Sequence, residues 1–127
     1  TESDIFGEWF NEEKDAVVTI YKDGNSISGK TTWLKEPLDS KGNAKLDLKN
    51  PDEKLRSRKR MGLKIMHSFK YNDQENNWED GRIYDPKKGK LYGGTATLVN
   101  ENELKLKGYI ISMPFLGRTA TWTRKTN

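Results

Sequence analysis

The chain has 127 residues, the length of one domain that can bury one hydrophobic core. Its net charge of +4 comes from 23 basic and 19 acidic residues, a mixed balance that does not by itself indicate a nucleic-acid-binding protein. The sequence has no Cys, which excludes disulfides and thiolate zinc sites, and no apolar run approaches the ~20 residues of a membrane-spanning helix.

Apolar and polar residues alternate with a period of two along much of the chain, which predicts strands. The alternation is clearest in residues 103–111, where Leu104, Leu106 and Ile110 share one side with Gly108. Eight segments are predicted as strands: Ile5 to Phe10, Ala16 to Lys22, Ser26 to Leu34, Leu63 to Tyr71, Trp78 to Tyr84, Lys90 to Leu98, Glu103 to Ile111 and Gly117 to Arg124. Each strand has one side suited to a core and one suited to water.

The connections between these strands are mostly short turns. In 23–25, Gly24 can adopt the positive φ of a hairpin turn, and in 85–89, Pro86 is preset for a type I turn. Links this short cannot make parallel crossovers, so the strands should pair antiparallel. Closing eight such strands into a barrel removes exposed edges. We therefore predict one all-β domain over residues 1–127, an antiparallel eight-stranded barrel.

One segment departs from the strand pattern, between the third and fourth predicted strands. In the stretch NPDEKLRSRKR, Asn50 is a good N-cap, Pro51 fits the first helical position, and Glu53 completes a capping box. Its basic residues come at the end, where a helix dipole favours them. We predict a short inserted helix over 51–60.

This helix has three possible roles. The first is a solvated helix anchored by Leu55, the second is a lid over the barrel, and the third is a basic arm that binds a polyanion. As a lid or partner surface it would use Leu55, Arg56, Arg58 and Arg60. Nucleic-acid binding is disfavoured because Asp47, Asp52 and Glu53 lie close to the basic residues in the sequence.

Alternation also places charged residues on the predicted inner face of the barrel. The inner sets would be Leu116, Arg118, Ala120, Trp122 and Arg124 in one strand, and Trp78, Asp80, Arg82 and Tyr84 in another. A buried charge must be paired or must meet a ligand. These residues therefore form either a structural network or a site in which Arg82 and Arg118 bind a polar head. In the second case Trp33, Phe69, Tyr84 and Trp122 would line the body of the ligand.

Catalytic and metal sites are weakly supported. His67 is the one candidate for imidazole catalysis, and it falls on an apolar face with Leu63, Ile65 and Phe69, as expected for a hydrogen-bonded core residue. The acidic pair Glu79 and Asp80 points to opposite sides of a strand. We expect no catalytic residue, no metal site and no cofactor.

Several motifs together resemble a bacterial family of small exported domains of unknown function. The motifs are Gly7-Glu8-Trp9, Asn50-Pro51-Asp52 with Leu55-Arg56-Ser57-Arg58, Gly81-Arg82-Ile83-Tyr84-Asp85-Pro86 with Gly89-Lys90 and Tyr92, and Phe115-Leu116-Gly117-Arg118-Thr119-Ala120-Thr121-Trp122-Thr123-Arg124. The resemblance implies export to the periplasm or cell envelope and supplies no catalytic residues. The start at Thr1, without Met, fits removal of a signal peptide.

The chain also resembles lipocalin-like, or calycin-like, barrels. These have Gly-x-Trp in the first strand and a late Arg that packs on the Trp at the closed end, which implies that Trp9 and Arg124 close the barrel here. Our functional hypothesis is an exported, non-enzymatic protein that binds a small amphiphilic or anionic ligand inside a lipocalin-like barrel. The alternative is an envelope interaction protein with a solid barrel, which binds a partner or polyanion through the basic helix.

Overall fold

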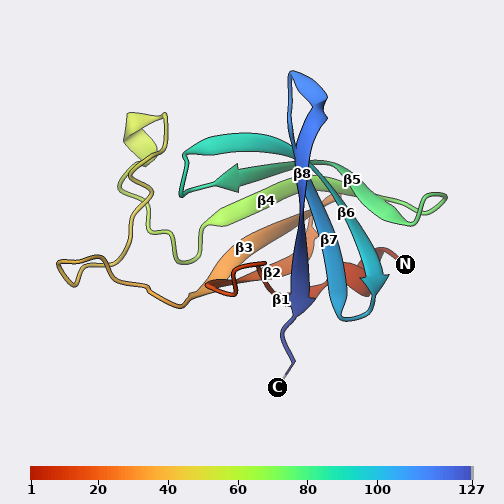
Figure 1. Ribbon diagram of the computed structural model, residues 1–127, viewed down its shortest axis with the longest axis horizontal. Coiled ribbons are helices and arrows are strands. Elements are labelled where there is room, and N and C mark those ends of the chain that lie inside the picture. Colours follow the sequence, from red (N-terminus) through yellow and green to blue (C-terminus); the bar gives the residue numbers. More distant parts are fainter. Residues whose placement is uncertain (127) are drawn as a thin grey trace.

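The computed structural model describes residues 1–126, and its strands form a closed antiparallel barrel in the order β1 to β8 (Figure 1). The strands are β1 Gly7–Phe10, β2 Ala16–Asp23, β3 Ser26–Leu34, β4 Lys64–Asn72, β5 Asn77–Asp85, β6 Lys90–Asn100, β7 Glu103–Ile110 and β8 Met113–Arg124. The predicted fold class, an antiparallel eight-stranded barrel, is confirmed. No helix among the described residues is long and apolar enough to cross a membrane.

One half of the barrel interior is solidly packed. Its core contains Trp9, Phe69, Trp78 and Leu104, all with at most 1% of their surface exposed. The ring of Phe69 occupies space left by two glycines of neighbouring strands: a β-carbon on Gly81 would lie 2.3 Å from the ring, and one on Gly94 would lie 2.8 Å from it. The remaining core residues are Ile5, Val18, Ile20, Ile27, Met66, Ala96, Leu106 and Trp122. Any open space in the barrel must therefore lie toward its other end.

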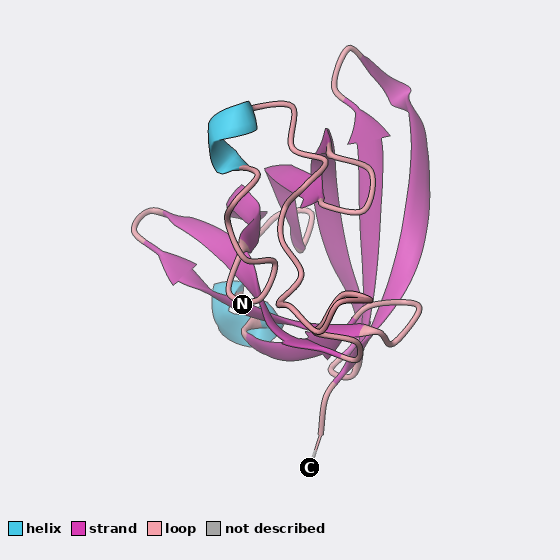
Figure 2. Cartoon of the chain, turned by 90° about the vertical axis from the view of Figure 1, so that its left-hand side faces the viewer, coloured by secondary structure: helices cyan, strands magenta, loops and turns pink. Residues whose placement is uncertain are grey.

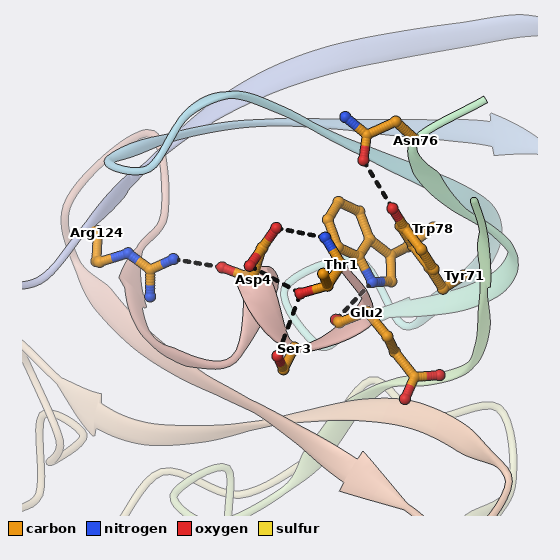
Figure 3. A network of polar contacts seen from close by, with 8 residues as sticks. All are labelled: Thr1, Glu2, Ser3, Asp4, Tyr71, Asn76, Trp78 and Arg124. Carbon is orange, nitrogen blue, oxygen red and sulfur yellow. Dashed lines mark hydrogen bonds and ion pairs between the residues drawn. The ribbon is translucent and has the colours of Figure 1, made fainter. Parts of the chain in front are cut away.

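The packed end is sealed by the N-terminal 3₁₀ helix η1, Glu2–Ile5, which replaces the start of the first predicted strand. The indole N–H of Trp9 donates to the carbonyl of Ile5 at 2.9 Å. The indole N–H of Trp78 donates to the carbonyl of Glu2 at 3.1 Å (Figure 3). Arg124 donates to the carbonyls of Asp4 and Phe6 at 2.7 and 2.8 Å, and its guanidinium lies 4.3 Å from the centre of the Trp9 ring. The resemblance to lipocalin-like barrels implied this pairing of Trp9 and Arg124.

Three β-bulges change which side chains face inward. Asp80 has φ 60° where β5 shifts register against β6, and Ser68 has φ 66° on β4. A third shift lies between Val17 and Val18, opposite β3. A bulge adds one residue to a strand, so the residues beyond it exchange faces relative to simple alternation. The predicted inner sets on β4 and β5 are wrong for this reason: Asp80 and Arg82 do not share the inner face with Trp78, and His67 does not share it with Phe69.

Residues 35–62, here called the strap, connect β3 to β4 and run along one side of the barrel (Figure 2). The predicted helix over 51–60 is reduced to one 3₁₀ turn, η2, Glu53–Leu55, capped by the side chain of Asp52. Asn50 is not the cap. Its side chain instead accepts from the backbone of Asp52 and donates to Asp47, and these bonds hold the backbone in turns rather than a helix.

Replacing Gly81 by Ala tests the packing of Phe69. The added methyl group meets the ring, so we expect a loss of about 1–3 kcal/mol in the free energy of unfolding. Gly108→Ala is the matched control, because a β-carbon there meets only Tyr92 Cβ at 3.9 Å. Chemical denaturation of both variants measures the difference, and equal stabilities would contradict the packing described.

Candidate ligand-binding cavity

The half of the barrel opposite η1 is hollow. It contains a cavity of about 860 Å³, which lies within the range of small-molecule sites. Strands β2 to β8 each contribute to its wall, through Val18, Thr31, Ile65, Ile83, Tyr92, Leu106 and Trp122 in that order. Most of these side chains are apolar. The cavity can therefore hold the hydrophobic body of a small molecule.

Charged side chains gather at the mouth of this cavity. Its lining includes six basic residues, Lys35, Lys45, Arg60, Lys87, Lys88 and Arg118, and four acidic ones, Glu13, Asp15, Glu36 and Asp85. Lys87 forms an ion pair with Asp15 at 2.7 Å, which links the β5–β6 turn to the β1–β2 connection across the mouth. The mouth has an excess of positive charge.

Among these six basic residues, Arg60 has a buried side-chain nitrogen without a hydrogen-bond partner. Its Nε is buried and has no hydrogen-bond partner among the described residues. Its backbone is fixed, because its N–H donates to the carbonyl of Lys45 at 3.0 Å. A buried guanidinium N–H without an acceptor costs free energy, and an anionic group in the cavity would relieve that cost.

A buried carboxylate holds the strap against the barrel. Asp47 is fully buried and accepts hydrogen bonds from Tyr84 Oη at 2.6 Å, Asn50 Nδ2 at 2.9 Å and Arg58 Nη2 at 3.0 Å. Burial acts to raise the pKa of Asp47, but these hydrogen bonds outweigh it and hold the pKa below its usual value. Burial, and then the bond to Asp47, raise the pKa of Tyr84 to about 12. This network holds the strap at Arg58. Arg60 lies two residues later in the strap, so the network also keeps Arg60 at the mouth of the cavity.

Three of the six residues predicted to contact a ligand line this cavity: Arg118, Tyr84 and Trp122. Leu116 and Ala120 also line it, so the inner face predicted for the last strand agrees with the structure. The side chain of Arg118 is 75% exposed and pairs with Glu12 at 3.1 Å, which places it at the rim. Tyr84 is bound to Asp47 of the strap, so it supports the mouth.

The other three residues predicted to contact a ligand, Phe69, Trp33 and Arg82, do not line the cavity. Phe69 is in the packed core. Trp33 is 41% exposed and packs edge-on against Phe10 on the outer face, because the bulge at Val17 and Val18 turns it outward. Arg82 is turned away by the bulge at Asp80, and its guanidinium donates to the carbonyl of Gly81. Neither predicted role for Arg82, in a network with Asp80 or at a ligand head, fits this position.

The predicted lid residues have different roles. Arg58 and Arg56 are used within the strap, where Arg58 binds Asp47 and Arg56 Nε donates to the carbonyl of Asn50 at 2.7 Å. Leu55 is half-buried, and Arg60 reaches the cavity.

His67 is half-buried and hydrogen-bonds to Ser68, and burial lowers its pKa, as do the nearby charges of Lys64 and Arg82.

Sequence reasoning missed the importance of Asp47. In the stretch around it, the hydropathy pattern is inverted, since Asp47 and Asn50 are buried while Leu48 is 67% exposed. Polar residues are normally the exposed ones. Only the motif residues Asn50, Arg58 and Tyr84, which converge on Asp47, could have indicated it.

Residues 7–124 match the model of a family described as "Uncharacterized protein conserved in bacteria (DUF2147)". The chain belongs to this family. Asn50, Arg58, Tyr84 and Arg124, which belong to the motifs quoted for the resemblance, hold the strap and the closed end. No curated protein matches the chain.

A solved structure with a similar fold is titled "Protein HP1028 from the human pathogen Helicobacter pylori belongs to the lipocalin family". The two chains are 20% identical, with a TM-score of 0.79, and the match covers 97% of this chain and 84% of the other. At this identity the likeness concerns the fold, which is a lipocalin-like barrel.

The strap should loosen at acid pH. The pKa of folded Asp47 lies below its ordinary 3.8, so its ionised form stabilises the strap above that value, and this stabilisation is lost as the pH falls through the folded pKa. NMR relaxation of strap amides below about pH 4 should report increased mobility.

Asp47→Asn should give a mobile strap already at neutral pH and a loss of about 1–3 kcal/mol in stability. Asp52→Asn is the control, because Asp52 is exposed and Asn also caps. A strap that stays rigid in Asp47→Asn at every pH would contradict the role of this carboxylate.

Proposed function

We propose that this protein binds a small amphiphilic molecule, with the apolar body inside the barrel and an anionic head at the mouth. The single observation that supports this most is the apolar cavity of about 860 Å³ whose mouth holds Arg60 with an unpartnered buried Nε. The proposal is of a binding protein, without a chemical step.

The wall of the cavity supports an apolar body. Val18, Ile65, Ile83, Leu106 and Trp122 surround it on several strands. Burying hydrocarbon against such a wall is favourable by ~0.8 kcal/mol for each methylene group. A chain of several methylene groups therefore gains enough to bind, and the wall imposes little chemical selectivity along it.

The mouth supports an anionic head. Arg60 offers a planar guanidinium suited to a carboxylate or phosphate, and Lys45 lies beside it through the backbone bond. Lys35 and Lys88 also line the mouth and have no ion-pair partner among the described residues. An anionic head would give Arg60 Nε a charge-assisted hydrogen bond, which is stronger than a bond to an uncharged acceptor.

Catalysis is not part of the proposal. His67 is the only histidine, and it is bound to Ser68 on the outer face, outside the cavity lining. The alternative of a solid barrel that acts through a basic helix has less support, since the barrel has a cavity and Arg56 and Arg58 are used within the strap.

Export to the periplasm or cell envelope stays a prediction. A protein that binds amphiphiles would find its ligands in the cell envelope, and this is consistent with export. Fractionation of bacteria that produce the protein from its natural gene checks the location, and recovery with the cytoplasmic fraction alone would contradict it.

The head contact is tested with cis-parinaric acid, a fluorescent fatty acid, in a binding titration. We expect Arg60→Gln to weaken binding about tenfold, because a charge-assisted hydrogen bond is lost. Lys59→Gln removes the same charge one residue earlier, from an exposed side chain that does not line the cavity, and should bind as the wild type does. Equal weakening in both variants would mean that only general charge matters, contrary to the proposal.

The body contact is tested by filling the cavity. Gly108 lines it and has open space at its β-carbon position, so Gly108→Leu should fold normally and abolish binding of the same fatty acid. A folded Gly108→Leu variant that binds with wild-type affinity would overturn the proposed site. Circular dichroism confirms folding in each case.

A further inference from the structure

The hairpin that joins β7 to β8 ends in an exposed apolar tip. Residues 110–116 contain no charged side chain, and Ile110, Ile111, Met113, Phe115 and Leu116 are all exposed, Phe115 by 79%. Apolar side chains gathered on one exposed turn are costly in water and mark an interaction surface. We call Ile111, Met113 and Phe115 the tip residues, since these three are exposed and do not line the cavity.

The hairpin extends beyond the part of the barrel that its neighbour covers. β1 pairs with β8 only at Arg124 and Thr123, so residues 113–120 of β8 have no strand on that side. In Figures 1 and 2 the tip stands at the upper end of the molecule, the end that also holds η2, and the C-terminus lies at the lower end. Ile110 and Leu116, at the base of the tip, line the cavity together with Arg60 of the strap. The tip therefore projects from the rim of the mouth.

The strap, at the same end of the molecule, has more basic than acidic residues, and Asp52 and Glu53 at η2 are also exposed there. Lys49, Lys54 and Lys59 of the strap are exposed and have no ion-pair or side-chain hydrogen-bond partner among the described residues. Lys49 lies against the β5–β6 turn, since a β-carbon on Gly89 would meet its carbonyl oxygen. Lys88 of that turn is also exposed and lines the mouth. The apolar tip and the strap with its unpaired lysines thus lie at the same end of the molecule.

We propose that this end of the protein docks on an anionic lipid bilayer, with the tip residues inserted among the lipids and the strap lysines bound to the headgroups. Insertion of apolar side chains together with electrostatic attraction is the combination by which proteins bind to membrane interfaces. Juxtamembrane Lys residues each contribute to binding at an anionic surface. The tip is the end of one hairpin with three apolar side chains, so it reaches only the interfacial region and does not span the bilayer.

The charge pattern favours a bilayer over a second copy of the chain. A second copy seated on the tip would bring an equally basic surface toward the strap lysines, and like charges repel. An anionic surface has the complementary sign. This docking does not require an occupied cavity, so it stands apart from the proposed function, although it would place the mouth of the barrel at the membrane.

The test is co-sedimentation of the full chain with vesicles of phosphatidylglycerol and phosphatidylethanolamine, compared with vesicles of phosphatidylcholine alone. We expect binding to the anionic vesicles that weakens as salt is added. The triple variant Ile111→Ser, Met113→Ser, Phe115→Ser should lower binding by at least about tenfold. Lys49→Gln, Lys54→Gln and Lys59→Gln combined should lower it on the order of a hundredfold and reduce the salt dependence.

Val99→Ser is the matched control for the tip. Val99 is 55% exposed on β6 and lies with Asn102 and Arg124 at the opposite, closed end. It should leave vesicle binding unchanged. All variants should bind cis-parinaric acid as the wild type does, because none of the substituted residues lines the cavity.

Three outcomes would overturn the docking proposal. The first is wild-type protein that stays in the supernatant with anionic vesicles at low salt. The second is tip and control variants that bind vesicles alike. The third is a dimer, detected by light scattering, that the tip variant converts to monomer while no form sediments with vesicles. That third result would assign the tip to a second copy of the chain.

Discussion

The barrel depends on Arg124, because the closing strand pair is very short. β1 meets β8 through only two residue pairs, with one further backbone bond from Lys125 to Glu8, and this is the shortest strand pairing of the barrel. The guanidinium of Arg124 reinforces this pairing. It donates to the backbone carbonyls of Asp4 and Phe6 and to that of Glu101 at 2.6 Å, and it lies on the Trp9 ring. A guanidinium on an indole face adds a cation–π attraction of roughly 0.5–2 kcal/mol. One side chain thus joins the N-terminal 3₁₀ helix, the first strand, the last strand and the β6–β7 turn.

Sealing one end determines where the function can lie. Large aromatic side chains fill the half of the interior next to Arg124, and glycines at 81 and 94 leave room for Phe69 there. The other half contains the cavity, whose wall includes Tyr92 and Trp122. The strap then shapes the mouth, since Asp47 fixes it to Tyr84 and so holds Arg60 over the opening. The basic stretch of the strap is neither a free helix nor a plain arm, because part of it anchors the segment and part of it faces the cavity.

The sequence predicted the architecture well and the site only partly. Turn residues and period-two alternation define the strands locally, and the last strand has no bulge in its inner portion, so Arg118 and Trp122 were assigned correctly to the inner face. Arg82, Trp33 and His67 were misassigned because bulges reverse the side-chain face, and nothing in the composition around Asp80 or Ser68 marks them as bulges. Arg60 and Asp47 acquire their positions from tertiary contacts of an irregular segment, which alternation cannot describe.

The central claim is that the hollow half of the barrel holds an amphiphile with an anionic head. Native mass spectrometry of protein purified gently from its own bacterium tests this most directly, with the same sample measured after denaturation. The account predicts an additional small mass that is released on denaturation and that fragments as an acid with a hydrocarbon body. A clean mass of the chain alone in repeated preparations, together with no thermal shift on adding fatty acids or lysophospholipids, would contradict it.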